Sequence, residues 1–169
     1  LAVVAAQPGA QLLVDLEIAT QNSLIIPTAG QESRWQFSRY RFAHDQIQQA
    51  AYEQIPPEQR CAVHLQMARL LWQETPPEQL DDRLFEITDH FNNGLLPGPA
   101  DWPGGNPAEQ QQVAQLNLQA GQRAKGSLAY DAALTYLQAG LTLLGAHPWQ
   151  TEYALTLALH EAIAEAAYL

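Results

Sequence analysis

The sequence predicts a mainly α-helical fold, in which one small β-hairpin near the start is followed by antiparallel helix pairs stacked as a right-handed helical repeat. Three observations predict it. Apolar residues recur at helical spacing from Ile47 onward, as in Ile47, Ala50, Ala51 and Ile55. Two short segments between positions 24 and 42 read as strands, one apolar and ending at a proline and one alternating. The tetrapeptide Pro-Pro-Glu-Gln occurs twice and opens two helices of similar length.

Residues 1–55 carry the only strand signals. A helix is predicted first, then a strand that ends at a proline, a loop that contains Gly30, an alternating strand and a second helix. The predicted ranges are Gln11–Asn22, Leu24–Pro27, Thr28–Ser33, Trp35–Phe42 and His44–Ile55. This order is typical of the second half of a winged helix. We therefore interpret residues 1–55 as the C-terminal part of a winged-helix domain.

Residues 56–96 are predicted to form a helix pair. The two Pro-Pro-Glu-Gln copies begin at Pro56 and Pro76, and each places an acidic residue in the first turn, where it complements the helix dipole. The short turn between the helices makes them antiparallel. The inward residues are predicted to be Val63, Met67, Leu70 and Leu71 on the first helix, and Leu80, Leu84, Ile87 and Phe91 on the second. Glycine and proline then dominate Asn93–Asn106, which predicts an irregular connection with a linker at 97–106.

Residues 107–169 are predicted to form three more helices. The first opens at Pro107, the second runs from about Leu128 to Leu144, and His147-Pro148 opens the last. Small and large residues alternate between the first two helices as in tetratricopeptide repeats (TPRs), at Gly121, Ala124, Tyr130, Ala133, Leu137 and Gly140. Small residues at these positions let two helix backbones approach. The pattern departs from the repeat at Asn117, where tryptophan is usual, and at Leu128, where a turn glycine is common.

Composition excludes several classes of function. The chain has 169 residues and a formal net charge of −10, which disfavours general binding to nucleic acid or to anionic membranes. Cys61 is the single cysteine, so an intrachain disulfide or a multi-cysteine metal site is excluded, and a cytoplasmic location is expected. The most apolar stretch, Tyr153–Leu169, is too short and too charged to span a bilayer. The chain lacks an initiator methionine and stops within a predicted helix, so we expect a fragment of a longer protein.

Motifs for catalysis and metal binding are incomplete. A P-loop needs Gly-Lys-Ser/Thr, whereas the sole lysine, Lys125, precedes Gly126-Ser127. His160-Glu161 begins a zinc-protease helix, but Ala164 replaces the second histidine, so no metal site is predicted. Cys61 and His64 share a helix face and offer a hidden thiol enzyme as an alternative, although no third orienting group follows from the sequence. No catalytic residue is therefore predicted.

A basic and aromatic cluster lies on the predicted hairpin. Arg34, Arg39 and Arg41 interleave with Trp35 and Tyr40. One interpretation is a DNA-binding transcriptional regulator of the winged-helix type, which would also use the Gln11–Asn22 helix. The other is a hairpin that packs on a neighbouring domain. The acidic net charge favours the second.

The run Arg41-Phe42-Ala43-His44-Asp45-Gln46-Ile47-Gln48-Gln49-Ala50-Ala51-Tyr52 resembles the segment that closes the winged helix in STAND-type signalling ATPases, which are AAA+/NACHT-like. More narrowly, it resembles large bacterial proteins that join serine/threonine kinase, ATPase, sensor and histidine kinase domains. Two later runs, Leu116–Gly121 and Ala129–Leu137, look like the helical region of the same group, as does Trp149–Leu169. The related ATPases carry a Met-His-Asp motif; here Ala43 replaces the methionine.

The resemblance implies a role for two residues. His44 would sense the phosphate of ADP in the full-length protein, and Asp45 would hold the local turn. The alternative is that Asp45 caps the next helix and His44 is an ordinary surface residue. The fragment itself would hold no cofactor, whereas the parent would use ATP or ADP with Mg. The implied function is a non-catalytic regulatory and scaffold segment that relays nucleotide state. Its expected partners are the upstream nucleotide-binding domain, downstream sensor or kinase domains, and other proteins bound by the helical repeats.

Overall fold

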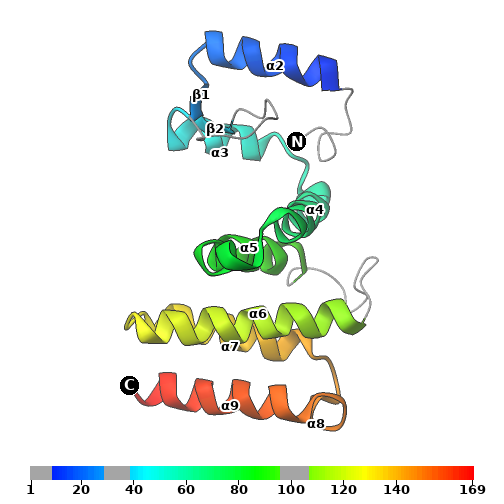
Figure 1. Cartoon of the computed structure of the whole chain (residues 1–169), viewed down its shortest axis with the longest axis vertical. Helices are drawn as coiled ribbons and strands as arrows, with labels where there is room; N and C mark the ends of the chain where they lie inside the picture. The colour runs from blue at the N-terminus through cyan, green and yellow to red at the C-terminus, as the bar shows by residue number, and fades with distance from the viewer. Residues whose placement is uncertain (1–8, 29–38, 96–106) are drawn as a thin grey trace. The chain divides into compact units, whose positions relative to one another are not determined.

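The chain forms two compact units in a computed structural model, which describes residues 9–28, 39–95 and 107–169 (Figure 1). The first unit is Leu1–Gln59 and the second is Arg60–Leu169. The structure is mainly helical with one small antiparallel sheet, which confirms the predicted fold class.

The described part of the first unit contains a helix, a two-stranded sheet and a second helix. These are α2 (Gly9–Gln21), β1 (Ile25–Thr28), β2 (Arg39–Phe42) and α3 (Asp45–Glu53). The strands pair antiparallel, with Ile25 opposite Phe42 and Thr28 opposite Arg39. The predicted loop at 29–33 and the start of the second predicted strand, residues 35–38, lie outside the described residues.

The second unit begins within α4 (Pro57–Glu74), which is followed by a short 3-10 turn, η1 (Pro77–Gln79), and α5 (Leu80–Leu95). The first Pro-Pro-Glu-Gln copy opens α4, and the second opens η1 rather than α5 itself. On α4 the buried residues are Leu65 and Ala68, whereas the four predicted inward residues are only half-buried. The apolar residues of α4 thus spread around the helix instead of forming one stripe.

Gly94 corrects the start of the predicted irregular connection at Asn93, whereas the predicted linker at 97–106 lies outside the described residues. Gly94 is buried inside α5, where its backbone lies against α4. A Cβ atom at Gly94 would lie 2.9 Å from the backbone nitrogen of Leu65 and 3.1 Å from the carbonyl oxygen of Cys61. The glycine is therefore required for close helix packing rather than for a turn.

The remaining helices are α6 (Pro107–Gly126), α7 (Tyr130–Leu143), α8 (Pro148–Thr151) and α9 (Tyr153–Tyr168). His147-Pro148 opens only the four-residue α8, because Glu152 leaves the helical region at φ −135° and ψ 54°. The last long helix therefore starts at Tyr153. In Figure 1, α6, α7 and α9 lie side by side.

One hydrophobic cluster runs through the second unit. Its fully buried members include Ile87, Val113, Leu137 and Leu159. A Cβ atom at Gly121 would lie 2.5 Å from Cγ of Leu137, and one at Gly140 would lie 2.9 Å from Cδ2 of Leu159. Backbone atoms also lie close: the carbonyl oxygen of Ala133 is 3.2 Å from the first of these Cβ positions, and that of Ala114 is 3.3 Å from the second. The predicted role of the two glycines, which is to let helix backbones approach, is therefore confirmed.

Candidate interaction site

His44 and Asp45 mark the start of α3. His44 is the N-cap, with extended backbone at φ −144° and ψ 150°, and its carbonyl oxygen accepts a hydrogen bond from the Ile47 N–H at 3.0 Å. Asp45 is the first helical residue, so the expectation that Asp45 caps the helix is wrong. Its carboxylate lies in the first turn, where it complements the helix dipole. Both side chains are exposed, and the ADP-sensing role stays a prediction.

Two other residues that the sequence singled out, His64 and Lys125, contact side chains of neighbouring helices. His64 packs against His90 of α5, with 2.9 Å between the two Nδ1 atoms. Burial lowers the pKa of both histidines, and the neighbouring ring adds to the effect at His64. Lys125, the sole lysine, pairs with Glu165 of α9. Among the residues that the structure describes, no group of three or more His, Cys, Asp or Glu side chains could hold a metal ion.

The basic cluster on the hairpin is only partly described. Arg41 is exposed on β2 opposite Ile26, and Tyr40 is half-buried opposite Pro27. Arg34 and Trp35 lie outside the described residues. The side chain of Arg39 is likewise not described, so Arg41 alone of the three predicted arginines can be placed, and the role of the cluster stays a prediction.

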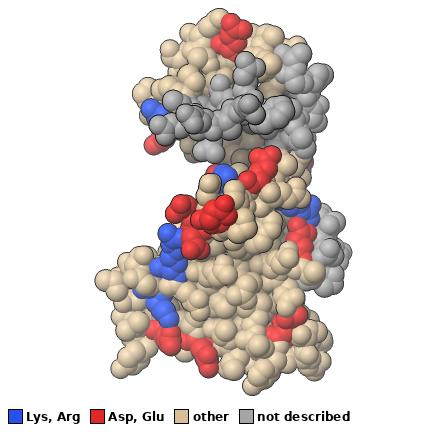
Figure 2. All heavy atoms as spheres, viewed as in Figure 1, with Lys and Arg blue, Asp and Glu red and all other residues tan. Residues whose placement is uncertain are grey.

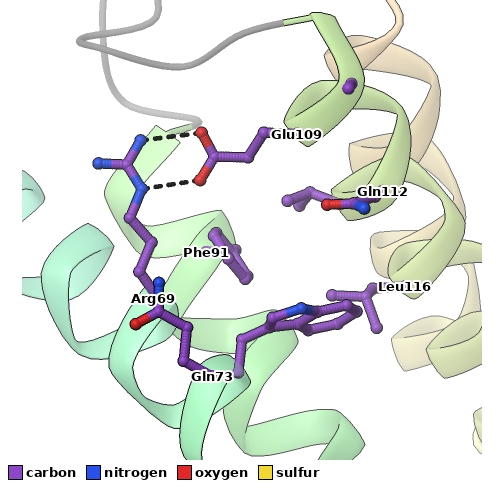
Figure 3. Close-up of a pocket in the computed structure, with 9 residues that line it drawn as sticks. Arg69, Gln73, Phe91, Glu109, Gln112 and Leu116 are labelled. Carbon is purple, nitrogen blue, oxygen red and sulfur yellow. Dashed lines mark hydrogen bonds and ion pairs between the residues drawn. The ribbon is translucent and has the colours of Figure 1, made fainter.

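A pocket of about 420 Å³ opens in the second unit between α4 and α6, with α5 behind them (Figure 3). Helical spacing explains how two helices supply most of its walls, because residues three and four apart share a face. The lining residues are Arg69, Trp72 and Gln73 of α4, Phe91 of α5, and Ala108, Glu109, Gln112, Val113 and Leu116 of α6.

An ion pair closes one end of this pocket. Arg69 donates from Nε to Glu109 Oε1 at 2.7 Å and from Nη2 to Oε2 at 2.9 Å, which is a two-pronged contact between α4 and α6 (Figure 3). The hydrogen bond to Glu109 raises the pKa of Arg69, and partial burial opposes it. The pair neutralises both charges, so this end of the pocket is polar but carries no net charge.

Aromatic rings and amides form the rest of the pocket. Phe91 is buried, and the Trp72 ring stands edge-on to it with centroids 6.4 Å apart. Gln73 and Gln112 add an amide from each side. Among the residues that the structure describes, none that lines the pocket carries a thiol, hydroxyl or imidazole group. The arrangement suits binding: the rings accept an apolar side chain, and the amides can hydrogen-bond to a peptide backbone.

Sequence reasoning found part of this site. It placed Phe91 on an inward helix face and began the helix that carries Glu109 at Pro107. It missed that Arg69 reaches Glu109, forty positions later in the chain. No local pattern signals such a pair, because the contact depends on how α4 and α6 pack.

Comparisons with known proteins give a limited match. No protein-family model matches the chain, and no solved structure matches it. The hybrid signal transduction histidine kinase G of Dictyostelium discoideum is 28% identical over 122 residues, which cover 63% of this chain. The chain spans 3% of the length of that relative. It is thus similar to a small segment of a signal-transduction protein. Within the described residues, no helix has the length and apolar character needed to cross a bilayer.

Proposed function

We propose that this chain is a non-catalytic regulatory and scaffold segment of a multidomain signalling protein. The observation that carries the proposal is its similarity to a segment of a signal-transduction histidine kinase. In this proposal, the first unit is the end of a winged helix that follows an ATPase domain of the STAND type. The second unit is a TPR-like scaffold that contacts other domains or proteins.

The pocket between α4 and α6 supports the scaffold role. Its lining combines two aromatic rings, two side-chain amides and an ion pair whose charges cancel. Such a lining is better suited to binding a protein segment than to catalysing a reaction on a substrate. The proposed ligand is an apolar side chain of a neighbouring domain of the same protein. The parent protein would supply the ATPase or kinase activity.

Filling the pocket tests this role. Gln112 is exposed at the pocket wall, so Gln112→Trp should block the pocket without disturbing the core. Gln115→Trp is the matched control, because Gln115 is also exposed on α6 but does not line the pocket. Calorimetric titration with the adjoining domains of the parent, produced separately, should show binding that is lost in Gln112→Trp alone. Equal binding by both variants would remove the pocket from the proposal.

The nucleotide relay in the first unit needs a separate test. In the parent protein, His44 would contact the phosphates of ADP bound by the upstream domain, and His44→Ala should weaken ADP binding there. The isolated chain lacks a P-loop, so it should bind neither ADP nor ATP with Mg. Tight binding of ADP to the isolated chain would contradict the proposal. Salt-dependent binding to duplex DNA would instead favour a winged-helix regulator.

A further inference from the structure

A second hollow lies between α5 and α7 and shares no residue with the pocket of Figure 3. Its volume is about 550 Å³. It is lined by Asp89, Asn92 and Asn93 of α5 and by Ala132, Thr135, Tyr136 and Ala139 of α7. We call it the α5–α7 groove. Alanine side chains and the Tyr136 ring form its apolar part, and its described lining contains no lysine or arginine.

Hydrogen-bond acceptors remain available in this groove. Asp89 Oδ1 accepts a hydrogen bond from the Tyr136 hydroxyl at 2.7 Å. Elsewhere in the described residues, ion pairs join other acids to arginine or lysine, and none involves Asp89. The Asn92 amide is occupied by a reciprocal pair of hydrogen bonds with Asn117. The Asp89 carboxylate in the groove therefore accepts a hydrogen bond from a hydroxyl group, but it forms no ion pair with a described lysine or arginine.

One guanidinium group already packs against α5, at residues that do not line the α5–α7 groove. Arg123 donates to the carbonyl oxygen of Asp81, and its guanidinium carbon lies 5.7 Å from the centre of the Phe85 ring. Phe85 in turn lies 5.6 Å from the Tyr136 ring, measured between centroids. Asp81, Phe85 and Asp89 are four positions apart on α5, so they lie along one side of that helix. Asp89 of α5 and Tyr136 of α7 thus also place an oxygen atom beside an aromatic ring, although this oxygen belongs to a carboxylate and the one bound by Arg123 to a backbone carbonyl.

Charge also favours a cationic partner. The chain carries a formal net charge of −10, which attracts cations over long distances. Figure 2 shows acidic side chains over α5 on the face in view, with lysine or arginine side chains beside them. A partner that brings an arginine would meet this field before it contacts the groove.

We propose that the α5–α7 groove binds an arginine-bearing segment of a protein partner. The guanidinium pairs with the Asp89 carboxylate and lies against the Tyr136 ring. Arginine fits better than lysine, because its planar fork can bind a carboxylate while its face stacks on an aromatic ring. The inference rests on the proposed function in assuming a protein partner, but it uses a groove separate from the α4–α6 pocket.

Nuclear magnetic resonance titration of the 15N-labelled chain tests this binding. The probe is the peptide acetyl-Ala-Arg-Ala-amide, with the citrulline peptide as its uncharged counterpart. Saturable shifts are expected at the amides of Asp89, Asn93 and Thr135, and citrulline should abolish them. Asp89→Asn should weaken binding by about fivefold.

Asp131→Asn is the matched control. Asp131 is exposed on α7 but does not line the groove, so this variant loses the same charge and should keep its affinity within about twofold. Ala132→Phe gives a second test, because a ring at this exposed position fills the groove without removing charge. Equal weakening by both asparagine variants, or unchanged binding in Ala132→Phe, would overturn the proposal.

The two proposals fail in different ways. Gln112→Trp blocks the α4–α6 pocket and should leave the arginine peptide bound. Whether Gln112→Trp loses binding to the adjoining domains tests the proposed function alone. If the arginine peptide causes no localised shifts, only the proposal for the α5–α7 groove is contradicted.

Discussion

Leu128 sits in the turn between α6 and α7 with a backbone conformation that L-residues avoid. Its φ is +64°, and its side chain is 72% exposed. The sequence pattern suggests glycine at this position, and the structure shows why: a left-handed residue with a Cβ atom costs about 1–2 kcal/mol. The apolar side chain of Leu128 gains little burial in return.

We predict that Leu128→Gly stabilises the chain by about 1 kcal/mol. The strain is relieved at this position, although the unfolded state gains some flexibility. Urea unfolding followed by circular dichroism measures the change. Ser127→Gly is the control, because Ser127 is exposed in the same turn without a positive φ. A Leu128→Gly variant no more stable than this control would contradict the assignment of strain.

At the scale of the elements, the contact between α4 and α5 depends on Gly94. We predict that Gly94→Ala destabilises the chain by about 1–3 kcal/mol, because the added methyl group would meet backbone atoms of Leu65 and Cys61 that cannot rotate away. Thermal unfolding measures the effect. Gly126→Ala is matched to it, since Gly126 is helical with nothing within 4 Å, and it should stabilise the chain by about 0.5–1 kcal/mol. Equal effects of the two substitutions would exclude close packing at Gly94.

The same pair of helices should respond to pH through His64 and His90. Their Nδ1 atoms are 2.9 Å apart, so one of them must be unprotonated for a hydrogen bond to form. Burial lowers both folded-state pKa values from 6.5, so the unfolded chain binds protons more readily. Stability from this contact is therefore complete above pH 6.5 and falls as the pH drops below it. The nearby acids Glu86 and Asp89 act in the opposite direction at His90.

Urea midpoints between pH 7.5 and pH 5.5 measure this dependence. The double variant His64→Asn/His90→Asn should lose part of the decline in stability that the native chain shows. His147→Asn should keep it, because His147 is an exposed residue in the segment between α7 and α8. If the double variant and the native chain lose stability equally on acidification, the pH dependence does not come from His64 and His90.

At the scale of the whole molecule, the boundary between the two units lies inside α4. A fragment of residues 56–169 keeps α4 intact and contains the continuous hydrophobic cluster of the second unit. We predict that it unfolds in one cooperative transition. A fragment of residues 60–169 should be less stable, by up to about 1 kcal/mol, because it lacks the first turn of α4 with Glu58. Circular dichroism with urea checks both, and a non-cooperative 56–169 fragment would refute the independence of the unit.

The sequence by itself determined the helical class, the small hairpin and the positions of most helices. Apolar spacing reports the backbone period, and proline marks helix starts, so both are local properties. It also identified Gly121 and Gly140 as close-packing positions, because small residues at helical spacing indicate near approach. It misplaced Gly94, since a glycine after a polar run looks like a turn whether or not another helix lies against it.

Only the tertiary structure decided which side chains meet. It joined Arg69 to Glu109 and Asn92 to Asn117, pairs that are 40 and 25 positions apart. It also created the pocket between α4 and α6 and the groove between α5 and α7. The physical reason is that these contacts depend on the separation and rotation of packed helices. Those quantities follow from the summed packing of the whole core and not from any local run of residues.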